Sequence, residues 1–285
     1  MFRSIFLSLL IFECFYSFSQ NSHSPYSIFG VGDIYNSSVG RNQSFGGGGY
    51  AIRSNLYLNP LNPASFTALD SMSFTFEFGM SAGTNTISNQ QASQKFDNSN
   101  LNYVGFGTRL NKHWSAGMGL MPYSRVNSRI SFTTDLNGLS ANTYYVSSGG
   151  IYKLYWANGF NVAPGFSLGL NIAYLFGSVN KSRMVLFPTS TASLNTQSES
   201  DLRVGDLFLE YGAQYQKKMA DAKLTAGFVM NTGTKVSYER DILSGTTYGV
   251  NVNSIKDNRM VDTIESLSIV KENFDIQFGT GLWKY

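Results

Sequence analysis

Few side chains in this sequence could do chemistry. His23 and His113 are the only histidines, and Cys14 is the only cysteine. A metal site or a histidine-based triad needs more partners than these residues supply. A run of glycines could suggest a phosphate loop, but no Lys-Ser or Lys-Thr pair follows it. The run consists of Gly46, Gly47, Gly48 and Gly49. We therefore predict a protein that is not an enzyme and has no cofactor and no metal site.

Two carboxylates remain of chemical interest. Glu77 and Glu210 each lie on the polar face of a segment in which apolar and polar residues alternate. Such residues either line a pore or pair with a cation, for which Arg109 and Arg203 are candidates. We favour the structural role, because polar networks commonly cross-link the interiors of β-barrels.

The elements that must position these residues are predicted to be strands. In residues 73–80, four large apolar side chains share one face, and Ser, Thr, Glu and Gly share the other. The same alternation recurs in residues 166–177, 206–215 and 274–282. Strict alternation indicates β-strands, and about ten residues suit a tilted strand that crosses a membrane. Small polar residues on the second face are typical of the inside of a barrel.

The connections between these segments differ in length. Long polar linkers are expected at residues 85–100, 133–142, 188–201 and 244–265, and short ones at residues 111–113 and 217–222. Long external loops and tight periplasmic turns are typical of outer-membrane barrels. We count about ten candidate strands from the alternation. The last is either the closing strand of the barrel or an interior strand of a longer one.

The composition fits the same class. Charged residues make up 14% of the chain, against roughly 25% in average soluble domains. A mean hydropathy of -0.12 excludes a bundle of transmembrane helices but not a barrel, because its lipid-facing and lumen-facing residues average out. The net charge of +3 is scattered along the chain, without the basic stripe that nucleic-acid binding requires. We expect no nucleic-acid partner.

The N-terminus indicates export. Arg3 precedes an apolar run over residues 5–12, and small and polar residues follow. This is the pattern of a secretory signal peptide, which we predict to be residues 1–19. The run is too short to anchor the chain in a bilayer. A lipoprotein signal at Cys14 is the less favoured alternative, because the residues before it do not fit a lipobox.

Residues 20–70 differ from the rest in being rich in Gly, Asn and Ser. They contain Asn62, Pro63 and Ala64 shortly before the first predicted strand. Taken alone, this triplet indicates a turn. Its position resembles the long-chain fatty acid transporter (FadL-type) family of outer-membrane proteins, in which an Asn-Pro-Ala motif and preceding glycines lie just before the first strand. Residues 24–33 also resemble outer-membrane proteins of the Bacteroidota.

The resemblance implies that two parts of the chain have different roles. Residues 20–70 would be a hatch that plugs the lumen of a barrel formed by residues 71–285, and hydrophobic substrates would pass it and leave sideways through the wall. The sequence departs from the family pattern at Ser65, where a glycine commonly follows, and in having fewer than fourteen predicted strands. Apolar residues on the otherwise polar inner faces are candidates for the lumen lining, namely Met121, Leu175, Phe208 and Val229.

The predicted fold is therefore all-β, a transmembrane antiparallel β-barrel with an N-terminal hatch, located in the outer membrane. The first hypothesis is passive uptake of hydrophobic small molecules, with outer-membrane lipid and such a ligand as partners. The alternative is a non-transporting barrel that serves as a subunit of a protein secretion or assembly complex and binds other outer-membrane proteins. A soluble secreted β-sandwich is the third. The polar loops favour transport.

Overall fold

The computed structural model describes residues 24–35, 38–88, 93–136, 138–188, 193–219, 222–231, 238–248, 260–261 and 276–284. The predicted signal peptide, residues 1–19, lies outside them. No helix in these ranges is long and apolar enough to cross a membrane. The described helices are short: η1 (Pro25–Ile28), α2 (Arg41–Ser44) and η2 (Pro63–Ala68).

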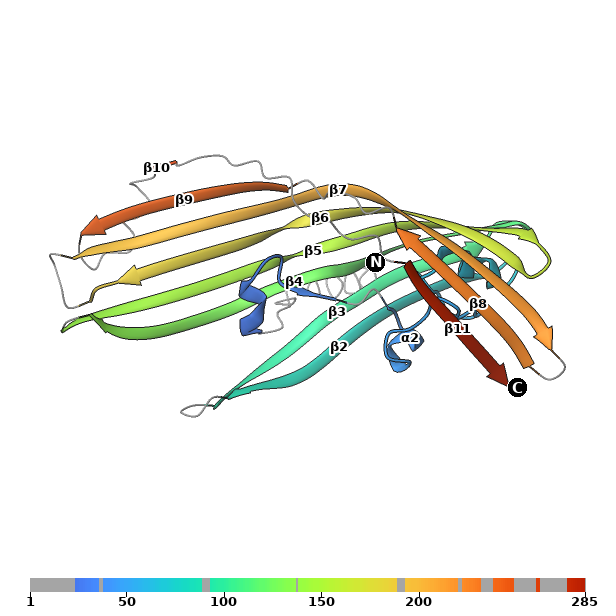
Figure 1. Cartoon of the computed structure of the whole chain (residues 1–285), viewed down its shortest axis with the longest axis horizontal. Coiled ribbons are helices and arrows are strands. Elements are labelled where there is room, and N and C mark those ends of the chain that lie inside the picture. Colours follow the sequence, from blue (N-terminus) through green and yellow to red (C-terminus); the bar gives the residue numbers. More distant parts are fainter. Residues whose placement is uncertain are drawn as a thin grey trace, which may run out of the picture.

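Antiparallel strands make up most of the described chain and confirm the all-β prediction. They are β1 (Asp33–Ile34), β2 (Phe74–Ser88), β3 (Ser93–Arg109), β4 (Trp114–Leu136), β5 (Leu139–Ala163), β6 (Phe166–Leu186), β7 (Leu194–Met219), β8 (Ala222–Asn231), β9 (Tyr238–Tyr248), β10 (Met260–Val261) and β11 (Ile276–Lys284). All belong to one sheet, in which β2 to β7 are neighbours in chain order. Figure 1 shows this sheet curling over α2 and η2.

The sheet forks at both sides. β7 pairs with β9 along residues 194–204 and with β8 along residues 210–219. On the other side, β3 pairs with β4 only between Val104↔Leu120 and Arg109↔Ser115. Beyond that point the β2–β3 hairpin diverges from β4 (Figure 1), and β1 pairs with β4 instead at Ser124 and Arg125.

Among the described strands the sheet stays open, as a curled half-barrel. β2 has β3 as its only strand neighbour, and β11 pairs only with β8. These strands therefore enclose no complete lumen, and the N-terminal hatch stays a prediction. The structure instead shows the segment before β2 lying against one face of the sheet, which we call the inner face.

Several predicted linkers are strands, so their assignment as loops was wrong. Residues 85–88 and 93–100 belong to the β2–β3 hairpin, and residues 133–136 and 139–142 to the β4–β5 hairpin. Most of the described part of residues 188–201 belongs to β7. Stretches rich in Ser, Thr and Asn lack the apolar alternation that indicates a strand, but pairing with a neighbouring strand extends the ladder through them. The strands consequently reach 26 residues, well beyond the length expected from alternation.

The outer face of the sheet carries a continuous group of exposed apolar side chains, which we call the apolar band. It consists of Phe74, Phe76, Phe78, Met80, Trp114, Met118, Leu120, Tyr152, Leu154, Trp156, Phe160, Leu168, Tyr174, Leu207, Tyr211, Tyr215 and Leu224. On β5 the band covers residues 152–160, which matches the roughly 9–11 residues that a tilted strand needs to cross a bilayer. An exposed apolar surface of this extent marks contact with lipid or protein.

Beyond the band the same strands continue as a second region, the extension, formed by residues 81–88, 93–100, 123–136, 139–151, 177–186, 194–204 and 238–248. Its outer face is mixed: Ser148 and Asn180 are exposed on neighbouring strands, and the exposed Tyr144 lies on the same face. The divergence of β3 from β4 begins where the band ends. Backbone groups in lipid must be paired internally, so a bilayer would tolerate this divergence only outside its apolar core.

Candidate functional site

The packing of residues 38–70, which we call the N-terminal segment, is built around Asn62. The Asn62 side chain caps η2, because its Oδ1 accepts a hydrogen bond from the Ala64 backbone N–H at 3.0 Å. Its Nδ2 donates to the carbonyls of Tyr50 at 2.7 Å and Ala213 at 3.2 Å. Pro63 follows at the first helical position, where its fixed φ suits the helix and its missing N–H costs nothing. One side chain thus joins η2, the preceding loop and β7.

Glycines of the sheet make room for this helix. A Cβ atom at Gly169 would collide with the backbone of Pro63 and Ala64, and one at Gly212 would collide with the Asn62 side chain. Asn62 and Ala64 are both fully buried. The Asn-Pro-Ala motif therefore supplies a helix cap (Asn62), a suitable first helical residue (Pro63) and a small side chain (Ala64) for a helix that lies directly on glycine backbone. That requirement is structural and is not specific to transport.

The glycine run lies at the end of α2. Gly46 and Gly47 have φ angles of 70° and 83°, a region that L side chains rarely adopt. The Gly47 N–H donates to the carbonyl of Asn42 at 3.0 Å and ends the helix. Gly48 follows, and a Cβ atom at Gly49 would lie 2.7 Å from Leu61 and 2.8 Å from Asn42. These glycines form a helix end and a tight contact within the N-terminal segment.

The candidate lumen residues lie on the inner face. Met121 packs in a core cluster with Phe66, Leu69 and Tyr155, and Leu175 packs in a second with Ile151 and Val204. Phe208 is partly buried and contacts both clusters. Val229 lies in β8, opposite Gly212 of β7. The structure brings these residues to the face that the N-terminal segment covers, and it does not test their role as a lumen lining.

The two predicted carboxylates have different partners. Glu77 accepts a hydrogen bond from the Leu58 backbone N–H at 2.8 Å, which ties β2 to the N-terminal segment. Glu210 forms an ion pair with Lys153 of β5 at 2.7 Å, and its second oxygen accepts from Asn171 at 3.0 Å. Only 3% of Lys153 is exposed. The pair therefore lies inside the region that carries the apolar band on its outer face.

The sequence prediction that Arg109 or Arg203 would pair with these carboxylates was wrong. Arg203 pairs with Asp201 at 3.2 Å, and Arg109 donates to the carbonyls of Asn111 and Lys112. Lys153 was missed, although a signal exists: it alternates with Tyr152 and Leu154, which places a lone cation on the inner face. Its partner is 57 residues away, and only the strand register brings the two together.

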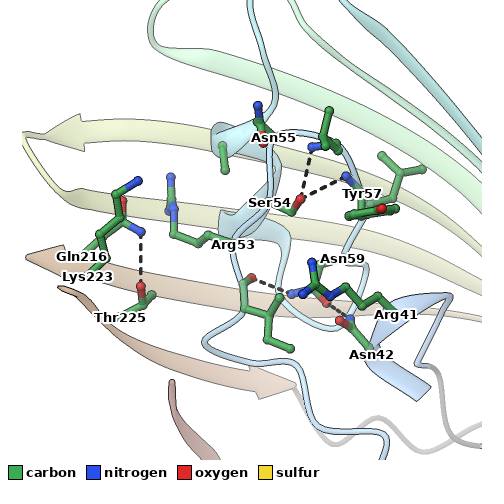
Figure 2. A pocket seen from close by; sticks show the side chains of 14 residues that line it. Arg41, Asn42, Arg53, Ser54, Asn55, Tyr57, Asn59, Gln216, Lys223 and Thr225 are labelled. Atoms are coloured by element: carbon green, nitrogen blue, oxygen red, sulfur yellow. Dashed lines mark hydrogen bonds between the residues drawn. The ribbon is translucent and has the colours of Figure 1, made fainter. Parts of the chain in front are cut away.

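A pocket lies at the end of the sheet where the turns are short. It is lined by residues 52–59 of the N-terminal segment, by Arg41 and Asn42, and by residues of β7 and β8. Its volume is about 540 Å³. Figure 2 shows Arg53, Gln216 and Lys223 on one side of it and Arg41 on the other. The cations of this pocket were not singled out from the sequence, because they come from three separate segments.

Arg53 is the most strongly held of these cations. Its guanidinium donates to Thr67 at 2.8 Å and to Ser167 and Gln214 at 3.1 Å each. Burial, with the nearby charge of Arg109 as the second cause, lowers the pKa of Arg53 to about 10. The positive charge is therefore held in an environment that disfavours it. Among the described residues, no group of three or more His, Cys, Asp and Glu could hold a metal ion.

A family model described as BamG matches residues 1–283. The chain belongs to the BamG family. The assignment as a FadL-type transporter is therefore wrong, and so is passive uptake of hydrophobic molecules, which rested on that resemblance. The BamG family is named for the BAM outer-membrane assembly complex, so this chain is an outer-membrane-associated protein that associates with other outer-membrane proteins. Searches of the curated proteins and of the solved structures gave no match.

Proposed function

We propose that this chain is a membrane-embedded, non-enzymatic subunit of the BAM complex that supports the assembly of other outer-membrane proteins. The match of the BamG family to nearly the whole chain carries the proposal. It corresponds to the alternative that the sequence left open, a barrel protein that serves an assembly complex.

The apolar band supports the membrane part of the proposal. Its side chains are exposed, as with Phe74 at 69% and Trp156 at 50%, although burying each of them would be worth about 1.5–3 kcal/mol. Outer-membrane lipid, or a partner within the membrane, would cover them. By the usual orientation of such proteins, the short turns face the periplasm and the extension projects outward.

The filled inner face supports a role other than transport. Behind the band, the N-terminal segment lies in direct contact with the strands, with Phe66 and Leu69 at 2% and 1% exposure. The Lys153–Glu210 pair and the Asn62 hydrogen bonds tie this packing together. A scaffold subunit needs such rigidity, whereas a permeation path would need the segment to move.

Co-purification tests the proposal. The tagged full chain would be extracted from outer membranes in mild detergent, and the BAM subunits bound to it measured by quantitative mass spectrometry. An unrelated tagged outer-membrane barrel of similar abundance is the control. We expect BAM subunits to be strongly enriched over this control, and depletion of the chain to lower the amounts of other outer-membrane barrels. BAM subunits at the control level, with unchanged barrel amounts, would refute the proposed function.

A further inference from the structure

We propose that the pocket at the short-turn end binds a carboxylate-rich polypeptide segment of a partner protein. The proposal deepens the proposed function, on which it rests, by giving the chemistry of a docking site. The pocket is lined by Arg41, Arg53 and Lys223, and none of its described lining residues is acidic. Asp70, which accepts a hydrogen bond from Asn55 at 2.8 Å, lies outside the lining.

The charges in the pocket favour an anionic ligand. Arg53, which lines the pocket, is fixed by its three hydrogen bonds, so an approaching anion would meet an ordered guanidinium. Arg41 lies over the rings of Phe45 and Tyr57, with its Cζ 5.7 Å and 6.0 Å from the ring centroids. Cations ordered in this way recognise carboxylates with little further loss of side-chain entropy. An anion would also offset the burial and repulsion that lower the pKa of Arg53.

The position of the pocket favours a polypeptide over a membrane lipid. Lys223, Gln216 and Thr225 line it from the inner face of β7 and β8. The neighbouring residues Tyr215 and Leu224 belong to the apolar band on the outer face. A lipid headgroup in the surrounding bilayer would meet the outer face, whereas the pocket opens on the inner side of the strands. A chain approaching from the periplasm has direct access to it.

Apolar residues beside the cations extend the surface that a peptide could bury. Leu56 and Tyr57 line the pocket and are 62% and 45% exposed. The Ser54 hydroxyl accepts hydrogen bonds from the backbone N–H groups of both residues, at 3.1 Å and 3.3 Å, and holds this turn in place (Figure 2). A segment that combines carboxylates with an aromatic or aliphatic side chain would match both kinds of contact.

Binding of a defined probe to the purified full chain in detergent tests the proposal. The probe is a short fluorescein-labelled peptide rich in glutamate with one tryptophan, followed by fluorescence anisotropy. The control peptide carries glutamine in place of each glutamate. We expect the glutamate peptide to bind about tenfold more tightly or better, because charge-assisted hydrogen bonds to arginine and lysine are lost with glutamine. Equal affinity for both peptides would overturn the proposal.

Matched double variants separate the pocket from general charge attraction. Arg41→Gln with Lys223→Gln removes two cations that line the pocket. Lys112→Gln with Lys217→Gln removes two exposed cations that do not line it. We expect the first pair to weaken binding about tenfold or more and the second about twofold or less, because exposed charges are screened by salt. Equal losses in both would refute a specific site.

Two further comparisons complete the test. Inorganic phosphate and free glutamate would be added as competitors at equal concentration, and stronger displacement by phosphate would overturn the assignment to a carboxylate peptide. The peptide assay uses the isolated chain. If the peptide does not bind but BAM subunits still co-purify, only the proposed binding site is refuted. Loss of co-purification with intact peptide binding refutes the proposed function and not the pocket's chemistry.

Discussion

The apolar band and the extension are two regions of the same strands with different outer faces. β5 runs through both: its outer face carries Tyr152, Leu154 and Trp156 in the band and Ser148 in the extension. The inner face differs as well. Behind the band, η2 lies directly on sheet glycines. In the extension, β1 pairs with the edge of β4, and Val31 packs against the inner-face cluster of Ile151, Leu175 and Val204. A single strand such as β5 therefore has different neighbours and a different outer face along its length.

Ion pairs give the largest expected contrast between the two regions. Lys153→Met leaves Glu210 without its cation behind the apolar band, and we expect the free energy of unfolding to fall by about 3–5 kcal/mol. Arg203→Met removes the exposed partner of Asp201 in the extension, where the expected loss is below about 1 kcal/mol. Urea unfolding in detergent, followed by tryptophan fluorescence, measures both.

A second substitution distinguishes a lost ion pair from damaged packing. Adding Glu210→Gln to Lys153→Met removes the uncompensated charge, so we expect it to restore part of the stability. Equal losses for Lys153→Met and Arg203→Met would mean that the buried Lys153–Glu210 pair is no better shielded from water than the exposed Arg203–Asp201 pair.

Charge on the outer face gives the next largest contrast. Leu154→Arg places a cation in the apolar band, and we expect a loss of about 2–4 kcal/mol if the position lies near the bilayer midplane. Ser148→Arg lies on the same face of the same strand in the extension, where we expect a change within about 0.5 kcal/mol. Folding into lipid vesicles, monitored by the shift between unboiled and boiled samples on a gel, reports both. Similar losses would contradict the boundary between band and extension.

Glycine substitutions give the smallest contrast. A Cβ atom at Gly169 meets the η2 backbone, which cannot move aside as a side-chain end can, so we expect Gly169→Ala to cost about 1–3 kcal/mol. In the extension, a Cβ atom at Gly83 would lie 3.7 Å from the Asn98 side chain, an ordinary contact. Gly83→Ala should therefore be close to neutral. The same urea titration serves, and a neutral Gly169→Ala would mean that η2 does not lie tightly on the sheet.

The sequence predicted the band better than the extension. Alternation of large apolar and small residues in 73–80, 166–177 and 206–215 correctly indicated strands, because one face of each is apolar enough to stand out. Parts of the extension, such as residues 133–142, were taken for loops, since they lack a regular alternation of apolar and polar residues. Strands form there because the β4–β5 ladder continues as far as the pair Leu136↔Leu139. No local sequence pattern reveals this continuation.

The site was predicted in part. The Asn62-Pro63-Ala64 triplet was recognised as important, but its similarity to a transporter motif led to the wrong family, because a capped helix on glycine backbone serves more than one function. Lys153 and Glu210 meet only through the register of β5, β6 and β7. The pocket cations come from α2, the loop after it and β8, so their proximity depends on how the N-terminal segment folds onto the sheet.

The difference between band and extension is tested most directly by measuring which positions of β5 are exposed to lipid and which to water. Trp156→Cys and Ser148→Cys, each in a Cys14→Ser background, would carry a nitroxide spin label on the chain reconstituted in lipid vesicles. We predict that the label at 156 is relaxed mainly by oxygen, which partitions into lipid, and the label at 148 mainly by a water-soluble nickel chelate. The same accessibility at both positions would contradict the account.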